Sequence, residues 1–391
     1  MKTVQLKKNE DRRARAGHLW IYSNEISNVR QEFVPGELVD VFSSGGNFIG
    51  RGYINPQSLI SVRLLARERR EIDKDFFAER IRRADQLRQT LYPNEKSYRL
   101  AYGEADGLPG LVIDRYEDVY VIQVSTLGMY VRLAEILGAL PAAGIAAAAV
   151  ILRTDTPMAQ LEGFPEESRV LSGECEHPVR IRQDGLLFDV DVLEGQKTGL
   201  YLDQRDNRVA AARLFAGARV LDCFSYMGAW GLYAGFAGAR DVLGLDSSSR
   251  AIEAARRHAE LNSLEPVCRF EEVDVFERLE DLTRSDERFD CIVLDPPALV
   301  KSKRHLPQGE AAYERLNRLA MTILSHDGFL ISCSCSFHVS GELFWLILSR
   351  AARKKRRSCT LIEWRGQSRD HPIPLAMPET SYLKCAFLRV S

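Results

Sequence analysis

Beyond Gly195 the chain alternates short apolar segments with helical segments, and this alternation limits the folds that it can adopt. The best-marked helix, SSSRAIEAARRHAELN, has serines at its N-terminal cap and places Ile252, Ala255 and Ala259 on one face. Repeated strand–helix units predict an α/β fold, with an open and mostly parallel sheet wrapped by helices. The strand-like segments are RVLDCFS, DVLGLD, CRFEEVDV, DCIVLD and GFLISCSC, followed by TLIEW and YLKCAFLRV.

The chain of 391 residues is too long for one ordinary domain, and its pattern changes twice. Residues 1–72 contain the strand-like segments ELVDVFS, NFIGRGYI and LISVRLLA, which predict a small β-rich binding module. The segment HLWIYSNEI before them predicts a helix or turn that leads into a strand. Residues 73–175 read as an α+β middle domain. Residues 176–391 contain a hairpin, VRIRQDGLLFDVDV, and then the α/β domain.

The middle domain begins with the helical segment DKDFFAERIRRADQLRQTLY. Its spacing places Phe76, Phe77, Ile81 and Leu87 on one apolar side, which we expect to be buried. Strand-like segments and an Ala-rich helical stretch follow, as expected of an α+β unit.

Composition excludes several classes of protein. No run approaches the ~20 apolar residues that a membrane span needs, and the N-terminal segment lacks the apolar stretch of a secretory signal, so we expect a cytoplasmic protein. The eight cysteines lack the paired spacing of a structural zinc site, and no metal is predicted. The net charge of −1 does not itself indicate a nucleic-acid partner. Arginine clusters, densest at RKKRR (353–357), are either solvated helix faces or phosphate contacts.

Acidic residues end successive strands of the predicted α/β sheet, where ligands bind in doubly wound folds. Asp222 offers a negative charge to a cationic ligand, and Gly228 permits a close approach of the backbone. Asp246 stands where an acid binds ribose hydroxyls, and Asp274-Val275 stands where a side chain meets an adenine edge. This set suits S-adenosylmethionine, which has a sulfonium, a ribose and an adenine but no phosphate. Helix capping explains any one acid but poorly explains all three.

Two further segments, Asp295-Pro296-Pro297 and Ser334-Cys335-Ser336, each follow an apolar strand. If the two strands are neighbours, their ends lie about 5 Å apart. A thiolate that adds to carbon 6 of cytosine makes carbon 5 nucleophilic enough to be methylated. Cys335 is the candidate nucleophile, favoured over Cys333 because it is nearer the carboxyl end, and Asp295 would hold or protonate the cytosine edge. The alternative interpretation of Cys335 is a buried core thiol.

The motifs DCFSYMG, DSS, DVF, DPPALVKSK and SCS, preceded by GLYLDQRDNR, resemble the RlmI-type 23S ribosomal RNA cytosine-5 methyltransferases. The resemblance covers the whole chain, since HLWIYSNEI and GRGYINPQSLISVRLL look like the PUA RNA-binding domain of that family. It implies a Rossmann-like methyltransferase domain, a 23S ribosomal RNA substrate, and Cys335 as nucleophile with Asp295 as its acid partner. The residues that it places around S-adenosylmethionine are Gln204, Arg205, Asp222, Phe224, Ser225, Gly228, Asp246, Ser247, Asp274, Val275 and Asp295.

The chain departs from related enzymes at one position. Many RNA cytosine-5 methyltransferases carry a second cysteine after the Pro-Pro pair, whereas this chain has Ala298, so release of the product must be managed otherwise. From the residues alone, the loop around Gln204 and Arg205 is equally well a structural corner, tied by Asp203 and Arg205.

Two other functions stay open at this point. Related guanine-N7 methyltransferases share the Asp-Pro-Pro segment but have Asn where Cys335 stands, and adenine-N6 enzymes have an aromatic residue in place of Ala298. A non-catalytic RNA-binding protein with a methyltransferase-like fold is the third reading, opposed by the acids at the strand ends. An edge strand of the N-terminal module that pairs with a second copy would give a homodimer.

Overall fold

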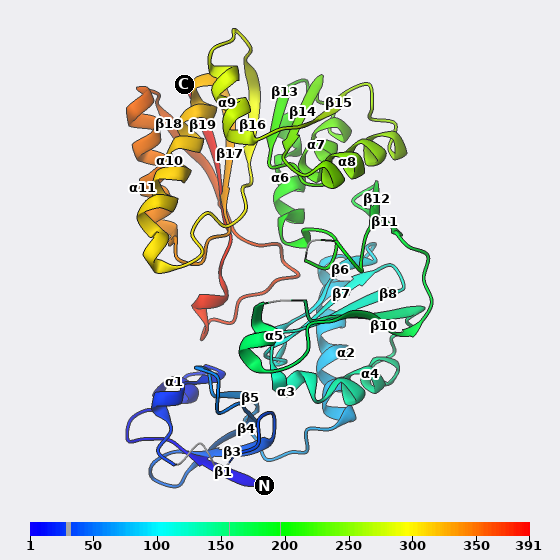
Figure 1. The fold of residues 1–391 in the computed structure, drawn as a ribbon, viewed down its shortest axis with the longest axis vertical. Coiled ribbons are helices and arrows are strands. Elements are labelled where there is room, and N and C mark those ends of the chain that lie inside the picture. Colours follow the sequence, from blue (N-terminus) through cyan, green and yellow to red (C-terminus); the bar gives the residue numbers. More distant parts are fainter. Residues whose placement is uncertain (29–32, 156, 196) are drawn as a thin grey trace. The chain divides into compact units, whose positions relative to one another are not determined.

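The computed structural model describes residues 1–28, 33–155, 157–195 and 197–391. By their contacts these described residues form two compact units (Figure 1). Unit 1 consists of residues 1–183, 190–202 and 369–380, and unit 2 consists of residues 184–189, 203–368 and 381–391. None of the helices in the described ranges is long and apolar enough to span a membrane.

The N-terminal part of unit 1 is a sheet with the strand order β1-β3-β4-β5-β2, which confirms the expected strands. The segment HLWIYSNEI differs from its prediction, because a short strand comes first and a 3-10 turn (Ser23–Glu25) follows. The edge strands are β1 and β2, and pairing with a second copy stays a prediction. The elements are β1 (Lys2–Gln5), α1 (Arg12–Arg15), β2 (Trp20–Ile21), β3 (Leu38–Phe42), β4 (Phe48–Ile54) and β5 (Val62–Ala66).

The next part of unit 1 is a sheet with the order β10-β9-β8-β7-β6, accompanied by helices. Helix α2 begins after Asp73, whose side chain accepts a hydrogen bond from the Phe76 N–H, as an N-cap should. The elements are α2 (Lys74–Leu91), β6 (Ser97–Tyr102), β7 (Leu111–Tyr116), β8 (Val119–Val124), α3 (Leu127–Tyr130), α4 (Leu133–Ala142), β9 (Ala149–Arg153), α5 (Pro157–Glu162), β10 (Ser168–Gly173) and β11 (Val179–Gln183).

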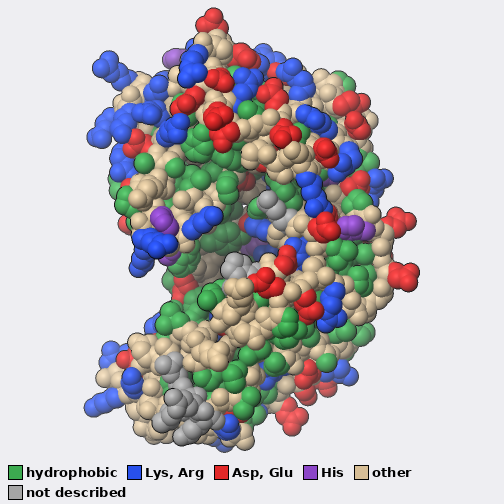
Figure 2. Space-filling view, viewed as in Figure 1, with side chains coloured by type: hydrophobic (Ala, Val, Ile, Leu, Met, Phe, Trp, Pro, Cys, Tyr) green, Lys and Arg blue, Asp and Glu red, His purple; other side chains and the backbone are tan. Residues whose placement is uncertain are grey.

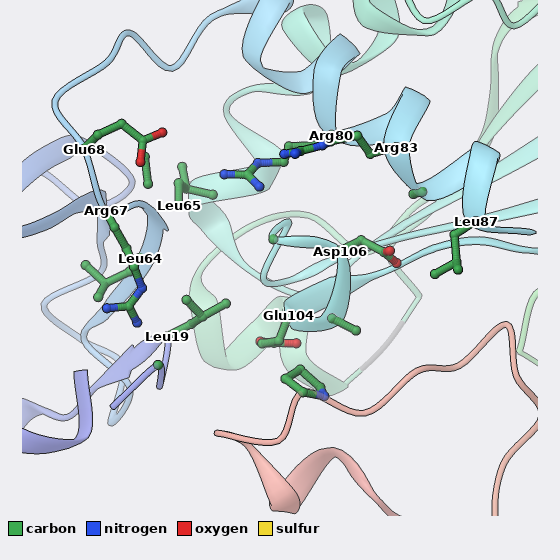
Figure 3. A pocket seen from close by; sticks show the side chains of 16 residues that line it. Leu19, Leu64, Leu65, Arg67, Glu68, Arg80, Arg83, Leu87, Glu104 and Asp106 are labelled. Carbon is green, nitrogen blue, oxygen red and sulfur yellow. The ribbon is translucent and has the colours of Figure 1, made fainter. Parts of the chain in front are cut away.

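The prediction for the apolar side of α2 is right for Phe76, Phe77 and Ile81, which are fully buried, and wrong for Leu87, which is 41% exposed. Leu87 lines a cavity of about 510 Å³ in unit 1 (Figure 3). The same cavity is lined by leucines and arginines that lie in or next to β2 and β5 and in α2: Leu19, Leu64, Leu65, Arg67, Arg80 and Arg83. A helical periodicity shows which residues share a side, but not whether a neighbouring element covers the whole of it.

Unit 2 contains the α/β sheet, with the strand order β15-β14-β13-β16-β17-β19-β18. Strands β13 to β17 pair in parallel, and β19 is antiparallel to both of its neighbours, so the predicted mostly parallel sheet is confirmed. Strand order reverses between β13 and β16, which is where ligands bind in such sheets. The strands are β13 (Arg219–Cys223), β14 (Asp241–Asp246), β15 (Cys268–Glu272), β16 (Phe289–Leu294), β17 (Leu324–Ser334), β18 (Cys359–Arg365) and β19 (Lys384–Val390).

Helices of unit 2 flank this sheet (Figure 1). The apolar core between the strands and α9, α10 and α11 includes Leu221, Ile292, Leu316 and Phe344. Strand β12 (Leu186–Val190) follows a turn in which Asp184 and Gly185 both have positive φ, as the Asp-Gly signal predicts. The helices are α6 (Arg205–Phe215), α7 (Ala229–Phe236), α8 (Ser249–Leu261), α9 (Val275–Thr283), α10 (Leu306–Ile323) and α11 (Gly341–Lys355).

The basic run at residues 353–357 lies at the end of α11. Lys354 forms an ion pair with Glu314, and the Arg357 guanidinium donates to backbone carbonyl oxygens, among them that of Ser325. Figure 2 shows Lys and Arg side chains beside Asp and Glu side chains over much of the visible face. Lys354 and Arg357 therefore bind other groups of the protein, which favours the helix-face interpretation of these two residues over phosphate contacts.

Candidate active site

The loop that follows β13 has an unusual backbone. Phe224, Tyr226 and Gly228 have φ angles of 64°, 49° and 83°. Residues other than glycine adopt this region at a cost, and such residues gather at functional sites. The Tyr226 N–H donates to Asp246 Oδ2 at 2.8 Å, and Asp246 ends β14. The loop is thus tied to the next strand, beside the place where strand order reverses.

Asp222 in β13 is fully buried, and its Oδ2 accepts a hydrogen bond from the Gly231 N–H at 2.9 Å. Burial raises the pKa of Asp222 to about 8, so its carboxyl holds a proton at neutral pH unless a cation lies nearby. Within the described residues, Asp222 Oδ1 and Ser225 Oγ are buried without a hydrogen-bond partner. Burial disfavours the charge of Asp222 more than Arg208 favours it, and this acid together with the unpartnered polar atoms fits a cationic, polar ligand such as S-adenosylmethionine.

The remaining residues of the predicted cofactor set lie at the ends of β14 and β15. Asp246 Oδ1 accepts from the Ser248 N–H at 2.9 Å, and Ser247 between them is exposed. Strand β15 ends at Glu272, earlier than predicted, and Asp274 is the N-cap of α9, accepting from the Glu277 N–H at 3.0 Å. Capping therefore describes what Asp274 does in this structure, and its contact with a cofactor stays a prediction.

Two more members of the set lie beside these. Val275, the first residue of α9, is buried. Phe224 packs edge-to-face against Phe276 of α9, with 6.2 Å between the ring centroids. The β13 loop and the start of α9 are therefore neighbours, as a shared pocket requires.

Gly228 is the position in this loop where a side chain costs most. A Cβ there would lie 2.8 Å from Phe270 Cζ and 2.9 Å from Ala255 Cβ, at a φ of +83°. We expect Gly228→Ala to lower the free energy of unfolding by about 2–5 kcal/mol, measured in urea, and to weaken S-adenosylmethionine binding. Gly238→Ala is the control, because Gly238 has a φ of +88° and no atom within 4 Å of its Cβ position. Equal losses in the two variants would contradict a role for the close contact.

Asp295 directly follows β16 and accepts two hydrogen bonds from buried side chains. Gln204 Nε2 donates to Oδ1 at 2.9 Å, and Trp230 Nε1 donates to Oδ2 at 3.0 Å. Burial raises the pKa of Asp295, which the hydrogen bond from Trp230 counteracts. The carboxyl is thus fixed in orientation, and it holds a proton closer to neutral pH than an exposed aspartate does.

The orientation of the Gln204 amide is itself determined by neighbouring side chains. Asn207 Nδ2 donates to Gln204 Oε1 at 2.7 Å, which leaves Gln204 Nε2 to face Asp295. Arg365 Nε donates to Asn207 Oδ1 at 2.8 Å and so orients the second amide. A directed chain of donors therefore runs from Arg365 through two amides to Asp295.

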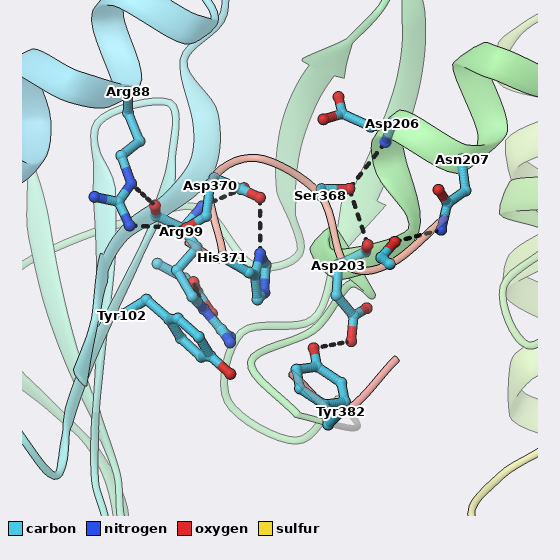
Figure 4. A network of polar contacts seen from close by, with 12 residues as sticks. Arg88, Arg99, Tyr102, Asp203, Asp206, Asn207, Ser368, Asp370, His371 and Tyr382 are labelled. Atoms are coloured by element: carbon cyan, nitrogen blue, oxygen red, sulfur yellow. Dashed lines mark hydrogen bonds and ion pairs between the residues drawn. The ribbon is translucent and has the colours of Figure 1, made fainter. Parts of the chain in front are cut away.

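Arg205, predicted beside the ligand, forms a bidentate ion pair with Asp184, at 2.6 and 2.9 Å. Asp203 accepts hydrogen bonds at its backbone oxygen from Ser368 and at Oδ2 from the Tyr382 hydroxyl (Figure 4). These contacts match the structural-corner interpretation of the loop. Of the two predicted loop residues, Gln204 is the one that the structure joins to Asp295.

The strands that carry the two chemical segments are neighbours, as predicted, because β16 pairs in parallel with β17. Cys335 Sγ lies 3.9 Å from the Pro296 carbonyl oxygen, and the side chain is partly exposed. Ser334 and Ser336 on either side both hydrogen-bond to the Tyr313 hydroxyl, at 3.0 and 2.9 Å. The thiol thus lies beside the Asp-Pro-Pro segment while the serines anchor the turn to α10.

Cys333 occupies a different environment. It is fully buried, and its Sγ lies 3.2 Å from the Sγ of Cys385 on β19. Burial raises the pKa of Cys333 well above its ordinary value, which keeps it a thiol. Of these two candidates, Cys335 is the one that a substrate can reach.

Three residues of this site escaped the sequence analysis: Trp230, Asn207 and Lys384, whose Nζ donates to the carbonyl oxygen of Ser336 directly after Cys335. Trp230 lies in an apolar helical segment that looks like ordinary core, and Asn207 lies in the GLYLDQRDNR motif, in which only Gln204 and Arg205 were singled out. Lys384 did carry a signal, since it is a charged residue inside the apolar segment YLKCAFLRV.

Two segments of the chain match known families. Residues 4–67 match a PUA-like domain, and residues 144–368 match the S-adenosylmethionine-dependent methyltransferases. Over 393 residues the chain is 38% identical to ribosomal RNA large subunit methyltransferase I of Shewanella denitrificans, with 99% of each chain covered.

Two solved structures resemble the chain over its whole length. A protein of Streptococcus mutans described as a SAM-dependent methyltransferase has a TM-score of 0.86 at 21% identity. A protein described as a methyltransferase and solved in complex with SAH has a TM-score of 0.87 at 20% identity. Both comparisons cover 100% of each chain, and at these identities they show the fold alone.

Proposed function

We propose that this chain, which belongs to the family of S-adenosylmethionine-dependent methyltransferases that includes ribosomal RNA large subunit methyltransferase I, acts on 23S ribosomal RNA. It methylates carbon 5 of a cytosine through a covalent adduct with Cys335. The observation that carries the proposal is the position of the Cys335 thiol, 3.9 Å from the Pro296 oxygen beside Asp295. A nucleophile and an acid at adjoining strand ends are what attack on a pyrimidine requires.

Each group has a distinct role in the proposed reaction. The sulfur of Cys335 adds to carbon 6 of the cytosine, and the electrons of the carbon 5–carbon 6 double bond become available at carbon 5. Asp295, oriented by Gln204 and Trp230, binds or protonates the edge formed by ring nitrogen 3 and the amino group. Removal of the proton from carbon 5 by a base then lets the sulfur leave.

S-adenosylmethionine supplies the electrophilic methyl group. We assign its binding to the loop after β13, with Asp222 and Ser225 facing its charged and polar groups. Asp246 would bind the ribose, and the start of α9 would meet the adenine. The cofactor fits this region because Asp222 Oδ1 and Ser225 Oγ are buried and have no hydrogen-bond partner among the described residues.

Ribosomal RNA is the proposed substrate class because the curated relative is named for it. The PUA-like segment at residues 4–67 would contribute to RNA binding. It lies within the proposed RNA-binding domain of residues 1–72. The further division into a middle domain (73–175) and a catalytic part (176–391) stays a prediction.

The decisive test uses RNA that contains 5-fluorocytosine. Fluorine at carbon 5 cannot leave as a proton does, so the adduct should persist and migrate with the protein under denaturing conditions. We expect the wild-type protein to form this adduct in the presence of S-adenosylmethionine, and nucleoside mass spectrometry of unsubstituted RNA to show 5-methylcytosine. Methylated guanine without an adduct would replace the proposal by the guanine-N7 function, and absence of cofactor binding would favour a non-catalytic RNA-binding protein.

A further inference from the structure

Lys384 is a buried cation in the sheet of unit 2. It begins β19, lies opposite Ser334 of β17 in the antiparallel register, and is 7% exposed. Its Nζ donates to the carbonyl oxygens of Ser336 and Tyr382, at 2.8 Å each. Within the described residues, no carboxylate forms an ion pair with it. The side chain is therefore a buried ammonium whose hydrogen bonds go to neutral oxygens.

Burial destabilises an ammonium that has no anion beside it, and so makes it easier to deprotonate. Burial lowers the pKa of Lys384 to about 8, and the charge of Cys335 acts in the opposite direction. Cys335 directly precedes Ser336, whose carbonyl oxygen accepts from Nζ. Among the described residues, Cys335 is the group whose negative charge favours the ammonium of Lys384.

We propose that Lys384 is a positioning residue that holds Cys335 as a thiolate, by accepting the proton of the thiol and remaining beside the sulfur as an ammonium. The catalytic use of the thiolate rests on the proposed function. The protonation state of the Cys335 thiol, however, can be measured without RNA. The proposal explains why a lysine, which is rarely buried, occupies a buried position in this sheet.

The proton and electron balance is simple. The lone pair of the neutral lysine amine takes the proton from the S–H bond, and the bonding electrons stay on sulfur. Those electrons form the bond to carbon 6 of the pyrimidine, while the ammonium keeps its proton. When the bond to carbon 6 breaks, its electrons return to sulfur beside the ammonium, and the ion pair is restored. No oxidant or further reactant is needed.

Other titratable groups face this pair from the surrounding elements. Tyr313 of α10 bonds to the two serines that flank Cys335, and burial raises its pKa, so it stays neutral. Asp295 adjoins from the end of β16 and is engaged by Gln204 and Trp230. Cys333 and Cys385 face each other across β17 and β19, and burial keeps Cys333 protonated. Asp203 accepts from the Tyr382 hydroxyl.

Alkylation by iodoacetamide reports the thiolate directly. We would measure the rate of modification of Cys335 between pH 5 and pH 10 by mass spectrometry with fragmentation that separates it from Cys333. In the wild type, the apparent pKa of Cys335 should lie below the ordinary value of about 8.5. Lys384→Met should raise it by about one pH unit or more, because the nearby cation favours the charged thiolate. Lys384→Arg should restore it, because the guanidinium keeps the charge.

Arg389→Met is the matched control, because Arg389 lies on the same strand with its side chain 54% exposed. It should leave the pH profile unchanged. An unchanged profile in Lys384→Met would overturn the inference. If Lys384→Met does not fold, the wild-type profile still decides, since an apparent pKa of about 8.5 or above contradicts the proposal. A wild type that forms no 5-fluorocytosine adduct refutes the cytosine-5 function instead and leaves the alkylation result to be read independently.

Discussion

Replacing Cys335 by alanine is expected to lower the rate of RNA methylation by at least about a thousandfold and to abolish the 5-fluorocytosine adduct, because the variant has no sulfur to add to carbon 6. Cofactor affinity, measured by calorimetry, should change little, since none of the residues assigned to the cofactor lies on β17 or in the turn that follows it. The side chain is partly exposed, so the loss of stability should be small as well.

Cys333→Ala is the matched control for this variant. It removes a thiol two residues away, but one that is fully buried against Cys385. We expect it to lose stability through the cavity that it leaves and to keep the adduct. A Cys335→Ala protein that methylates RNA at the wild-type rate would contradict covalent catalysis by this residue, and Cys335 would then be a structural thiol.

Asp295→Asn is expected to lower the turnover rate by about 10²- to 10⁴-fold. Both oxygens of Asp295 accept N–H donors, from Gln204 and from Trp230. Asparagine keeps only one acceptor, so its NH₂ group must face one of these donors, and the substrate edge loses a group that can give or take a proton. Single-turnover rates with saturating RNA and cofactor measure this effect apart from binding.

The control for Asp295 is Asp290→Asn, near the start of the same strand. Asp290 forms an ion pair with Arg240 at the surface, and its side chain is 38% exposed. This variant should keep its turnover rate, because an exposed ion pair contributes little and lies at the opposite end of β16. Asp295→Asn with an undiminished rate would show that the carboxyl does not act on the substrate, although Gln204 and Trp230 hold it in place.

Much of the fold could be predicted because its signals are local. Apolar runs of strand length that alternate with helices specify a parallel sheet, and the sheet of unit 2 confirms it. The carboxyl ends of parallel strands share one edge, so the placement of Asp295 and Cys335 on adjoining strand ends also followed from the chain. The exposed Leu87 shows the limit, since its periodicity was helical but the neighbouring elements leave a cavity beside it.

The contacts that give these residues their chemistry depend on non-local pairing. Lys384 meets the Cys335 turn only because β19 inserts antiparallel beside β17, in a register that sets it opposite Ser334. Trp230 reaches Asp295 from the first turn of α7, and Asn207 orients Gln204 from α6. The same packing decides that Cys333 is buried while Cys335 is accessible.

Local sequence patterns were enough to predict which segments become strands, which polar residues end them, and hence the kind of ligand and reaction to expect. The donors that orient Asp295, the hydrogen bond from Lys384 to Ser336 beside Cys335, and the pairing of Arg205 with Asp184 could be seen only in the folded chain. The reason is physical: the periodicity of a strand or helix is set by residues a few positions apart. The charge and solvation of a buried group, in contrast, are set by side chains that the fold brings from distant parts of the chain.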